Sequence, residues 1–72
     1  MKKVKKIKIK INGKLSIIND NLTLLSYLKR LNIPLKKVAI ELNQVIMDKN
    51  KLNKIQLKMG DKIEIVHFIG GG

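Results

Sequence analysis

The sequence predicts an α+β domain in which a mixed sheet of four to five strands is covered by one main helix. Two stretches alternate apolar and polar residues as half-buried strands do, one up to residue 11 and one over residues 63–68. Between them, leucines recur at helical spacing from Leu24 to about Leu31, behind the N-cap residue Thr23. One long helix covers one face of a sheet, so two layers are expected.

The first hairpin is set by its turn residues. Asn12-Gly13 marks a tight turn after a strand at residues 2–11 with a lysine-rich outer face. A two-residue loop would place Leu15 opposite a lysine and mix the two faces. A three-residue loop, with the glycine as a left-handed bulge, instead pairs Ile9 with Leu15 and Ile7 with Ile17. We therefore predict the three-residue loop, because it keeps the apolar face whole.

The remaining elements follow from turn residues and short apolar runs. Asn32 in a left-handed cap and Pro34 end the helix. We then expect strands at residues 38–42 and 45–47, a polar loop over residues 48–54, and a Gly60-Asp61 turn before the last strand. The last strand is the most apolar, so it is expected in the centre of the sheet, parallel to the first. This arrangement is the β-grasp, or ubiquitin-like, fold, with residues 1–69 as one domain and residues 70–72 as a flexible tail.

The residue types leave little room for catalysis. The sequence has no cysteine, which excludes disulfides, thiolate metal sites and a cysteine nucleophile. His67 is the single histidine, and a lone histidine on an apolar strand is more often packed or exposed than a base or ligand. The five carboxylates fall mostly at turns, where capping is their expected role. We therefore predict no enzyme activity, no metal and no bound cofactor.

The net charge of +11 makes nucleic-acid binding an alternative. Arg30, however, is the one arginine among sixteen basic residues, and lysine lacks the guanidinium fork that reads bases and phosphates. Tyr27 and Phe68 are the two aromatic residues, too few for a base-stacking platform. Sequence-specific nucleic-acid binding is thus the less favoured reading. The sequence contains no apolar run that could span a bilayer and no signal-peptide pattern, so a cytoplasmic location is expected.

The final glycines, Gly70, Gly71 and Gly72, have no side chains to pack. Their distinctive group is the α-carboxylate of Gly72. Glycine leaves the approach of a nucleophile to an activated terminal carbonyl unhindered and lets the segment enter a narrow channel. Just before them, Val66 and Phe68 are expected to point away from the core, on the opposite side from Ile63 and Ile65.

Several motifs together resemble the ThiS family of sulfur carriers of thiamine biosynthesis. They are the hairpin Ile11-Asn12-Gly13, Thr23-Leu24 opening a leucine-rich helix, Val38-Ala39-Ile40-Glu41-Leu42-Asn43, Val45-Ile46, and the stretch from Leu57 through Gly60-Asp61 to Gly72. The resemblance covers nearly the whole chain. Two features depart from it: the lysine-rich start, and residues 48–54, which lack the aromatic often found in that loop.

The resemblance implies a carrier that other proteins act upon. A ThiF-like adenylating enzyme would use ATP to form an acyl-adenylate on Gly72, sulfur from a donor system would replace AMP, and a ThiG-like thiazole synthase would consume the thiocarboxylate. Gly70 and Gly71 would thread into the partner, and Val66, Phe68 and Ile69 would dock on it. A related carrier, for molybdopterin-type sulfur transfer or for protein conjugation, is the alternative within the same fold.

Overall fold

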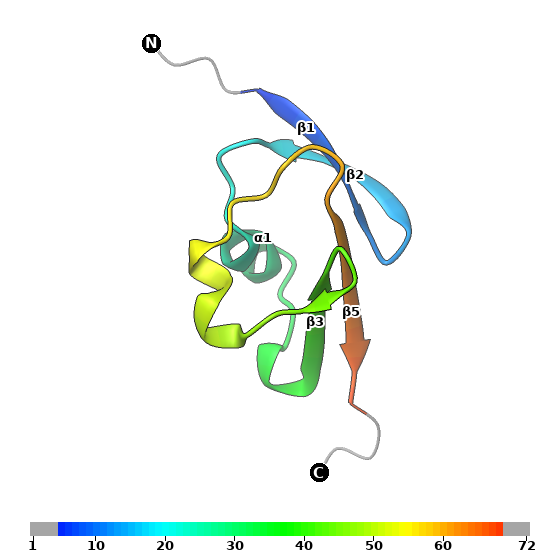
Figure 1. The fold of residues 1–72 in the computed structure, drawn as a ribbon, viewed down its shortest axis with the longest axis vertical. Helices are drawn as coiled ribbons and strands as arrows, with labels where there is room; N and C mark the ends of the chain where they lie inside the picture. Colours follow the sequence, from blue (N-terminus) through cyan, green and yellow to red (C-terminus); the bar gives the residue numbers. More distant parts are fainter. Residues whose placement is uncertain (1–4, 69–72) are drawn as a thin grey trace.

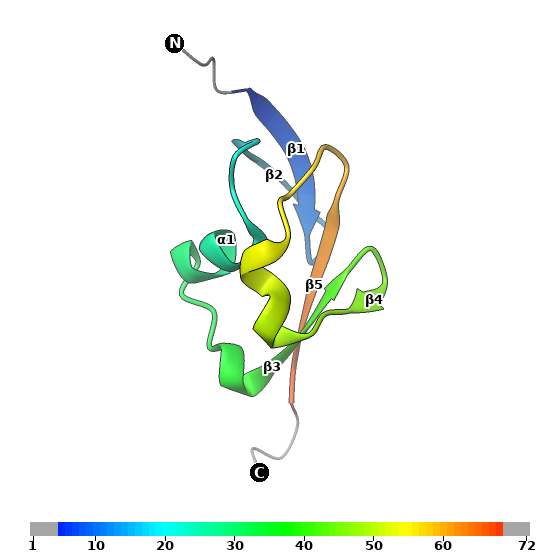
Figure 2. The same ribbon diagram turned by 60° about the vertical axis from the view of Figure 1, so that its left-hand side comes forward.

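The computed structural model describes residues 5–68, which form a five-stranded mixed sheet with helices on one face (Figures 1 and 2). The elements in chain order are β1 (Lys6–Ile11), β2 (Lys14–Asn19), α1 (Leu24–Arg30), the 3₁₀ helix η1 (Leu35–Lys37), β3 (Val38–Leu42), β4 (Val45–Ile46), the 3₁₀ helix η2 (Lys49–Lys54) and β5 (Lys62–His67). The strand order is β2-β1-β5-β3-β4, with β5 parallel to β1 and antiparallel to β3. The predicted β-grasp architecture, with the last strand in the centre, is confirmed.

The first hairpin differs from its prediction. Asn12 and Gly13 alone join β1 to β2, and their φ angles of 49° and 81° are those of a type I′ turn. The register pairs Ile9 with Ser16, so the predicted three-residue loop is wrong. Leu15 and Ile17, which were expected in the core, are 61% and 60% exposed on the outer face.

Two contacts explain the observed register. The Asn12 N–H donates to the Ile63 carbonyl (2.9 Å), and the Asn12 side-chain oxygen accepts from the Ile65 N–H (2.8 Å), which fixes the turn against β5. On the inner face, the hydroxyl of Tyr27 in α1 donates to the Ser16 hydroxyl at 3.1 Å. The buried tyrosine ring thus packs on the inner side of β2 and is tied to it through Ser16.

Helix α1 begins and ends close to its predicted bounds. The Thr23 side chain accepts from the Ser26 N–H (3.1 Å), as an N-cap residue does. Asn32 takes the predicted left-handed conformation, with a φ of 58°. Leu31, the last leucine of the helical pattern, is the C-cap residue; it is 41% exposed and lies outside the core. Tyr27 is buried instead, together with Leu24 and Leu28.

The segment 48–54, predicted to be a polar loop, contains the 3₁₀ helix η2. Asp48 caps it by accepting from the Asn50 N–H (2.9 Å), and Leu52 is fully buried. After η2, the chain is tied to the start of α1, because the Leu24 N–H donates to the Ile55 carbonyl at 2.8 Å. Helices α1 and η2 together therefore cover the inner face of the sheet.

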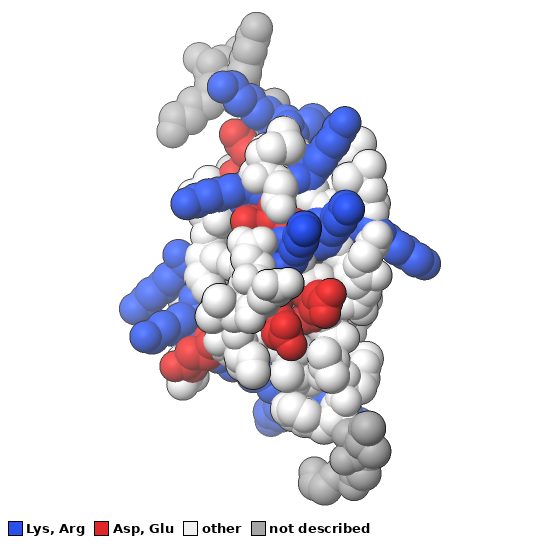
Figure 3. Space-filling model, turned by 45° about the vertical axis from the view of Figure 1, so that its right-hand side comes forward, with Lys and Arg blue, Asp and Glu red and all other residues white. Residues whose placement is uncertain are grey.

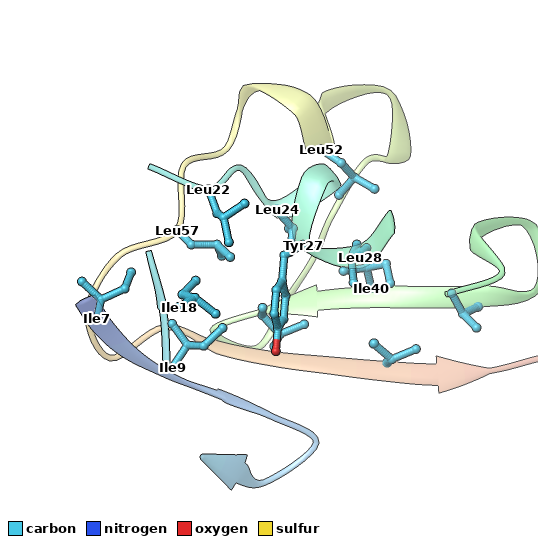
Figure 4. Packing of buried hydrophobic residues seen from close by; sticks show 13 residues of the cluster. Ile7, Ile9, Ile18, Leu22, Leu24, Tyr27, Leu28, Ile40, Leu52 and Leu57 are labelled. Carbon is cyan, nitrogen blue, oxygen red and sulfur yellow. The ribbon is translucent and has the colours of Figure 1, made fainter. Parts of the chain in front are cut away.

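The core lies between these helices and the sheet (Figure 4). Buried apolar side chains come from β1, β2, β3 and β5, from α1 and η2, and from two connecting segments. They are Ile7, Ile9, Ile18, Leu22, Leu24, Tyr27, Leu28, Val38, Ile40, Leu52, Leu57, Ile63 and Ile65. Among residues 5–68, no helix has the length and hydropathy needed to cross a membrane.

Candidate functional site

The candidate site is the end of β5 together with the surface around it. β5 lies between β1 and β3 and leads the chain to Phe68. The predicted tail residues Gly70, Gly71 and Gly72 and the predicted docking residue Ile69 lie outside the described residues. The site can therefore be built from the strand, from the groups that hold it, and from the side chains exposed next to its end.

Two asparagines hold β5 from its two sides. Asn12, in the β1–β2 turn, bonds to the backbone of Ile63 and Ile65 as described above. On the other side Asn43, in the β3–β4 turn at a φ of 52°, donates its N–H to the Lys62 carbonyl (2.7 Å). The Asn43 side-chain oxygen accepts from the Lys62 N–H at 2.9 Å. Just beyond the ends of β1 and β3, hydrogen bonds from Asn12 and Asn43 to the backbone of β5 thus take the place of strand pairing.

Asp61 extends this arrangement to the turn before β5. Its carboxylate is 9% exposed and accepts from the Asn43 side-chain amide (3.0 Å) and from the Lys58 N–H (2.8 Å). Gly60 has a φ of 87°, a left-handed conformation that a side chain would strain. Hydrogen bonds among Asn43, Lys58, Asp61 and Lys62 therefore hold the start of β5.

Val66 and Phe68 stand exposed near the end of β5, at 48% and 56%. Their predicted orientation away from the core is confirmed, while their role in docking stays a prediction. Phe68 is held in place at two points. Its N–H donates to the Lys37 carbonyl (3.0 Å), and the Lys49 ammonium lies 5.2 Å from the centre of its ring. The ring is therefore presented to solvent in a defined position.

The outer face of the sheet divides into two parts. In one part, Glu41 of β3 stands opposite Glu64 of β5 and, on its other side, opposite Ile46 of β4, which is 71% exposed. Val66 of β5 follows on the same face, opposite Ala39. The lysines of β1 cover the other part. Figure 3 shows the face turned away from α1, with adjacent acidic side chains near the middle, and with most of the lysines, and further acidic side chains among them, nearer the N-terminal end. Exposed apolar groups thus lie at the end of β5, with the two glutamates earlier on the same face and the Lys49 ammonium over the Phe68 ring.

The structure shows no cluster of side chains placed to bind a metal in the part of the chain that it describes. His67 is exposed and stands opposite Val38, and residues 5–68 contain no group of three His, Asp or Glu side chains placed to hold a metal ion. Sequence reasoning did not identify Asn12, Asn43 and Lys49 as parts of this site. The two asparagines had a visible signal, since asparagine in a short turn often takes the left-handed conformation. Lys49 had no such signal in the sequence, because its contact with Phe68 joins two segments that are far apart along the chain.

Comparison with known proteins places the chain in a family. The model of the ThiS family matches residues 8–72. The sulfur carrier protein ThiS of Bacillus subtilis is 35% identical over 65 residues, which are 89% of this chain and 98% of that protein. The crystal structure of the thiamine biosynthesis protein ThiS from Geobacter metallireducens superposes with a TM-score of 0.81 at 28% identity, covering 92% of this chain and all of that one.

A second kind of relative is much longer. The thiazole synthase of Paramagnetospirillum magneticum is 38% identical over 66 residues, which are 92% of this chain. The chain spans 20% of the length of that protein, so the match concerns a ThiS-like segment of a thiazole synthase. The family match, the Bacillus relative and the shared fold agree over nearly the whole chain, and the chain belongs to the ThiS family.

Proposed function

We propose that this protein is the sulfur carrier of thiamine biosynthesis and that Gly72 is the residue that carries the sulfur. The observation that best supports the proposal is the extent of the family match, which runs from β1 through Gly72 and so includes the glycines together with the fold. In this role the protein is a substrate for other enzymes and needs no catalytic group of its own.

The chemistry takes place at the α-carboxylate of Gly72. A carboxylate oxygen attacks the α-phosphorus of ATP, pyrophosphate leaves, and an acyl-adenylate forms. Sulfide delivered by the donor system then attacks the acyl carbon and expels AMP, and the product is a thiocarboxylate on Gly72. A ThiF-like enzyme supplies the ATP site, and a ThiG-like thiazole synthase takes up the sulfur. This chain contributes an unhindered carbonyl and a tail that fits a narrow channel.

Docking uses the surface around the end of β5. Val66 and Phe68 offer exposed apolar area directly before the glycines, and Ile69 would continue it. The hydrogen bonds of Asn12, Asn43 and Asp61 hold the strand in one direction, so a partner that binds this surface receives the tail from a fixed starting point. A rigid strand ahead of the glycines reduces the conformational entropy that the chain loses on binding.

The test is the intact mass of the protein after incubation with a ThiF-like enzyme, ATP and a sulfur donor. We expect a mass increase equal to the replacement of one oxygen by sulfur, located at Gly72. Removal of Gly72 should abolish the product, and the matched control is the same variant's unchanged thermal unfolding. A mass change on an internal residue, or one that survives the deletion, would contradict the proposal.

A further inference from the structure

Strand β2 forms the one long open edge of the sheet in residues 5–68. It lies at one end of the strand order and has six residues, whereas β4 at the other end has two. In the strand order, β1 lies between β2 and β5. An open edge strand offers unpaired backbone groups to any further strand, and natural proteins usually protect it.

The register shows which backbone groups face the open edge. In β1, even-numbered residues bond toward β5, as the Lys10 N–H does to the Asp61 carbonyl (2.9 Å). Odd-numbered residues of β1 therefore bond to β2, where they stand opposite even-numbered residues. The N–H and carbonyl groups of Leu15 and Ile17 consequently point away from β1, toward the edge.

The same two residues carry the exposed apolar side chains of β2. Leu15 and Ile17 are 61% and 60% exposed, and both lie on the outer face of the sheet. The strand has none of the usual protecting devices in its middle: it contains no proline, and its pairing with β1 is continuous, without a bulge. Apolar side chains and free backbone groups thus coincide at one place.

The charges around this edge select the kind of partner. Lys10 stands opposite Leu15, Lys8 stands opposite Ile17, and Lys14 begins the strand, all of them exposed. A second copy of the chain would bring the same lysines against them, on top of a net charge of +11 on each copy. A segment with acidic residues beside its apolar ones would gain attraction where a second copy is repelled.

We propose that the β2 edge binds an extended, acidic segment of a partner protein as a sixth strand of the sheet. Backbone hydrogen bonds to Leu15 and Ile17 hold the segment, and its own apolar residues at alternate positions pack beside these two side chains. Acidic residues at its ends are attracted by the charges of Lys8, Lys10 and Lys14, which lie beside the two apolar side chains and at the start of β2. This surface is separate from the end of β5, and the inference does not depend on the sulfur-carrier function.

The experiment uses a synthetic peptide with valine at alternate positions, threonine between them and two glutamates at each end. Amide hydrogen exchange of the full chain is followed by NMR with and without the peptide. We expect the Leu15 and Ile17 amides to exchange fast in the free protein and to become protected in the complex. The Ser16 and Ile18 amides, already bonded to β1, should change little. The same peptide with lysines in place of glutamates should bind on the order of tenfold more weakly.

Variants separate backbone pairing from side-chain contact. Ile17→Pro removes the N–H that faces the edge, and proline is tolerated in an edge strand at such a position. It should weaken peptide binding on the order of tenfold, and Ile17→Ala, which keeps the N–H, should weaken it less. The double variant Lys8→Glu and Lys10→Glu gives a second test that leaves the backbone unchanged. Val45→Ala, exposed at the opposite edge, is the matched control and should bind as the parent does.

Three results would overturn the proposal. They are protection that maps to β4 or to the end of β5, equal binding of the acidic and lysine-flanked peptides, and self-association of the chain through β2 without any peptide. Each variant is also tested for thiocarboxylate formation. Normal thiocarboxylate formation together with lost peptide binding is the expected pattern, because it places the two functions on separate surfaces.

Discussion

Asn12 combines three roles at one position. Its backbone is left-handed, its N–H bonds to Ile63, and its side chain accepts from the Ile65 N–H. Asn43 has an equivalent position on the other side of β5, with the carboxylate of Asp61 as an additional partner. Asparagine suits both places because it tolerates the left-handed region and its short amide reaches neighbouring backbone groups.

Two substitutions separate the roles of Asn12. Asn12→Gly keeps the left-handed backbone but removes the acceptor, so the free energy of unfolding should fall by about 1 kcal/mol. Asn12→Ala adds backbone strain and should lower it by roughly 1–2 kcal/mol more. Urea denaturation measures both values, and hydrogen exchange at Ile65 reports the lost bond. Equal stabilities of the two variants would show that the left-handed backbone has no energetic consequence here.

Phe68 is the residue at which docking and stability are most clearly separable. Its ring is 56% exposed and lies under the Lys49 ammonium, so Phe68→Ala should lower the free energy of unfolding by only about 0.5–1 kcal/mol. Binding to the adenylating enzyme should weaken by about tenfold or more, as for a central aromatic contact. Lys49→Gln is the control, since it removes the cation and keeps the ring. A loss of several kcal/mol with unchanged binding would instead place Phe68 in the core.

Among the elements, those with strong local signals were predictable. The alternating strands and the capped helix follow from periodicity and turn residues, and the central position of β5 follows from its apolar composition. The register of the first hairpin does not, because it depends on contacts of Asn12 with β5 and of Ser16 with Tyr27, far away in the sequence. The rule that all apolar residues of a hairpin share the inner face failed here, and the residues that break it, Leu15 and Ile17, form the proposed edge site.

Helix η2 was missed because its sequence is almost entirely polar. One buried residue, Leu52, decides its place, and six residues give too few turns for an apolar period to be recognised. The candidate site was predictable to a similar degree. The exposure of Val66 and Phe68 followed from strand alternation, whereas the contact of Phe68 with Lys49 required the position of η2 in space.

A substitution in η2 tests this packing. Leu52→Ala should lower the free energy of unfolding by about 2–5 kcal/mol, the usual range for a fully buried leucine. Lys51→Ala, one residue earlier and exposed, should stay within about 0.5 kcal/mol of the parent. Thermal or urea unfolding followed by circular dichroism measures both. Similar small effects of the two would mean that η2 does not close the core.

At the scale of the whole molecule, the charge is unevenly placed. Lys6, Lys8 and Lys10 form a cationic row on β1, while Glu41 and Glu64 lie side by side between that row and the exposed apolar groups near the end of β5. Figure 3 shows both regions on one face. A partner that docks at the end of β5 meets apolar groups, the two glutamates and the Lys49 ammonium, and the lysines of β1 act on it at longer range.

The role of the lysines is testable by substitution and by salt. Replacing Lys6, Lys8 and Lys10 with Gln should remove weak, non-specific DNA binding and change thiocarboxylate formation only modestly. For the parent chain, rising ionic strength should slow association with the adenylating enzyme and leave the chemical step unchanged, because exposed charges are screened within roughly 8 Å at physiological salt. Stopped-flow association and a DNA mobility assay measure the two effects. Tight, sequence-selective DNA binding that the substitutions abolish would identify the cationic row as a nucleic-acid surface, and the carrier function would then not account for the charge.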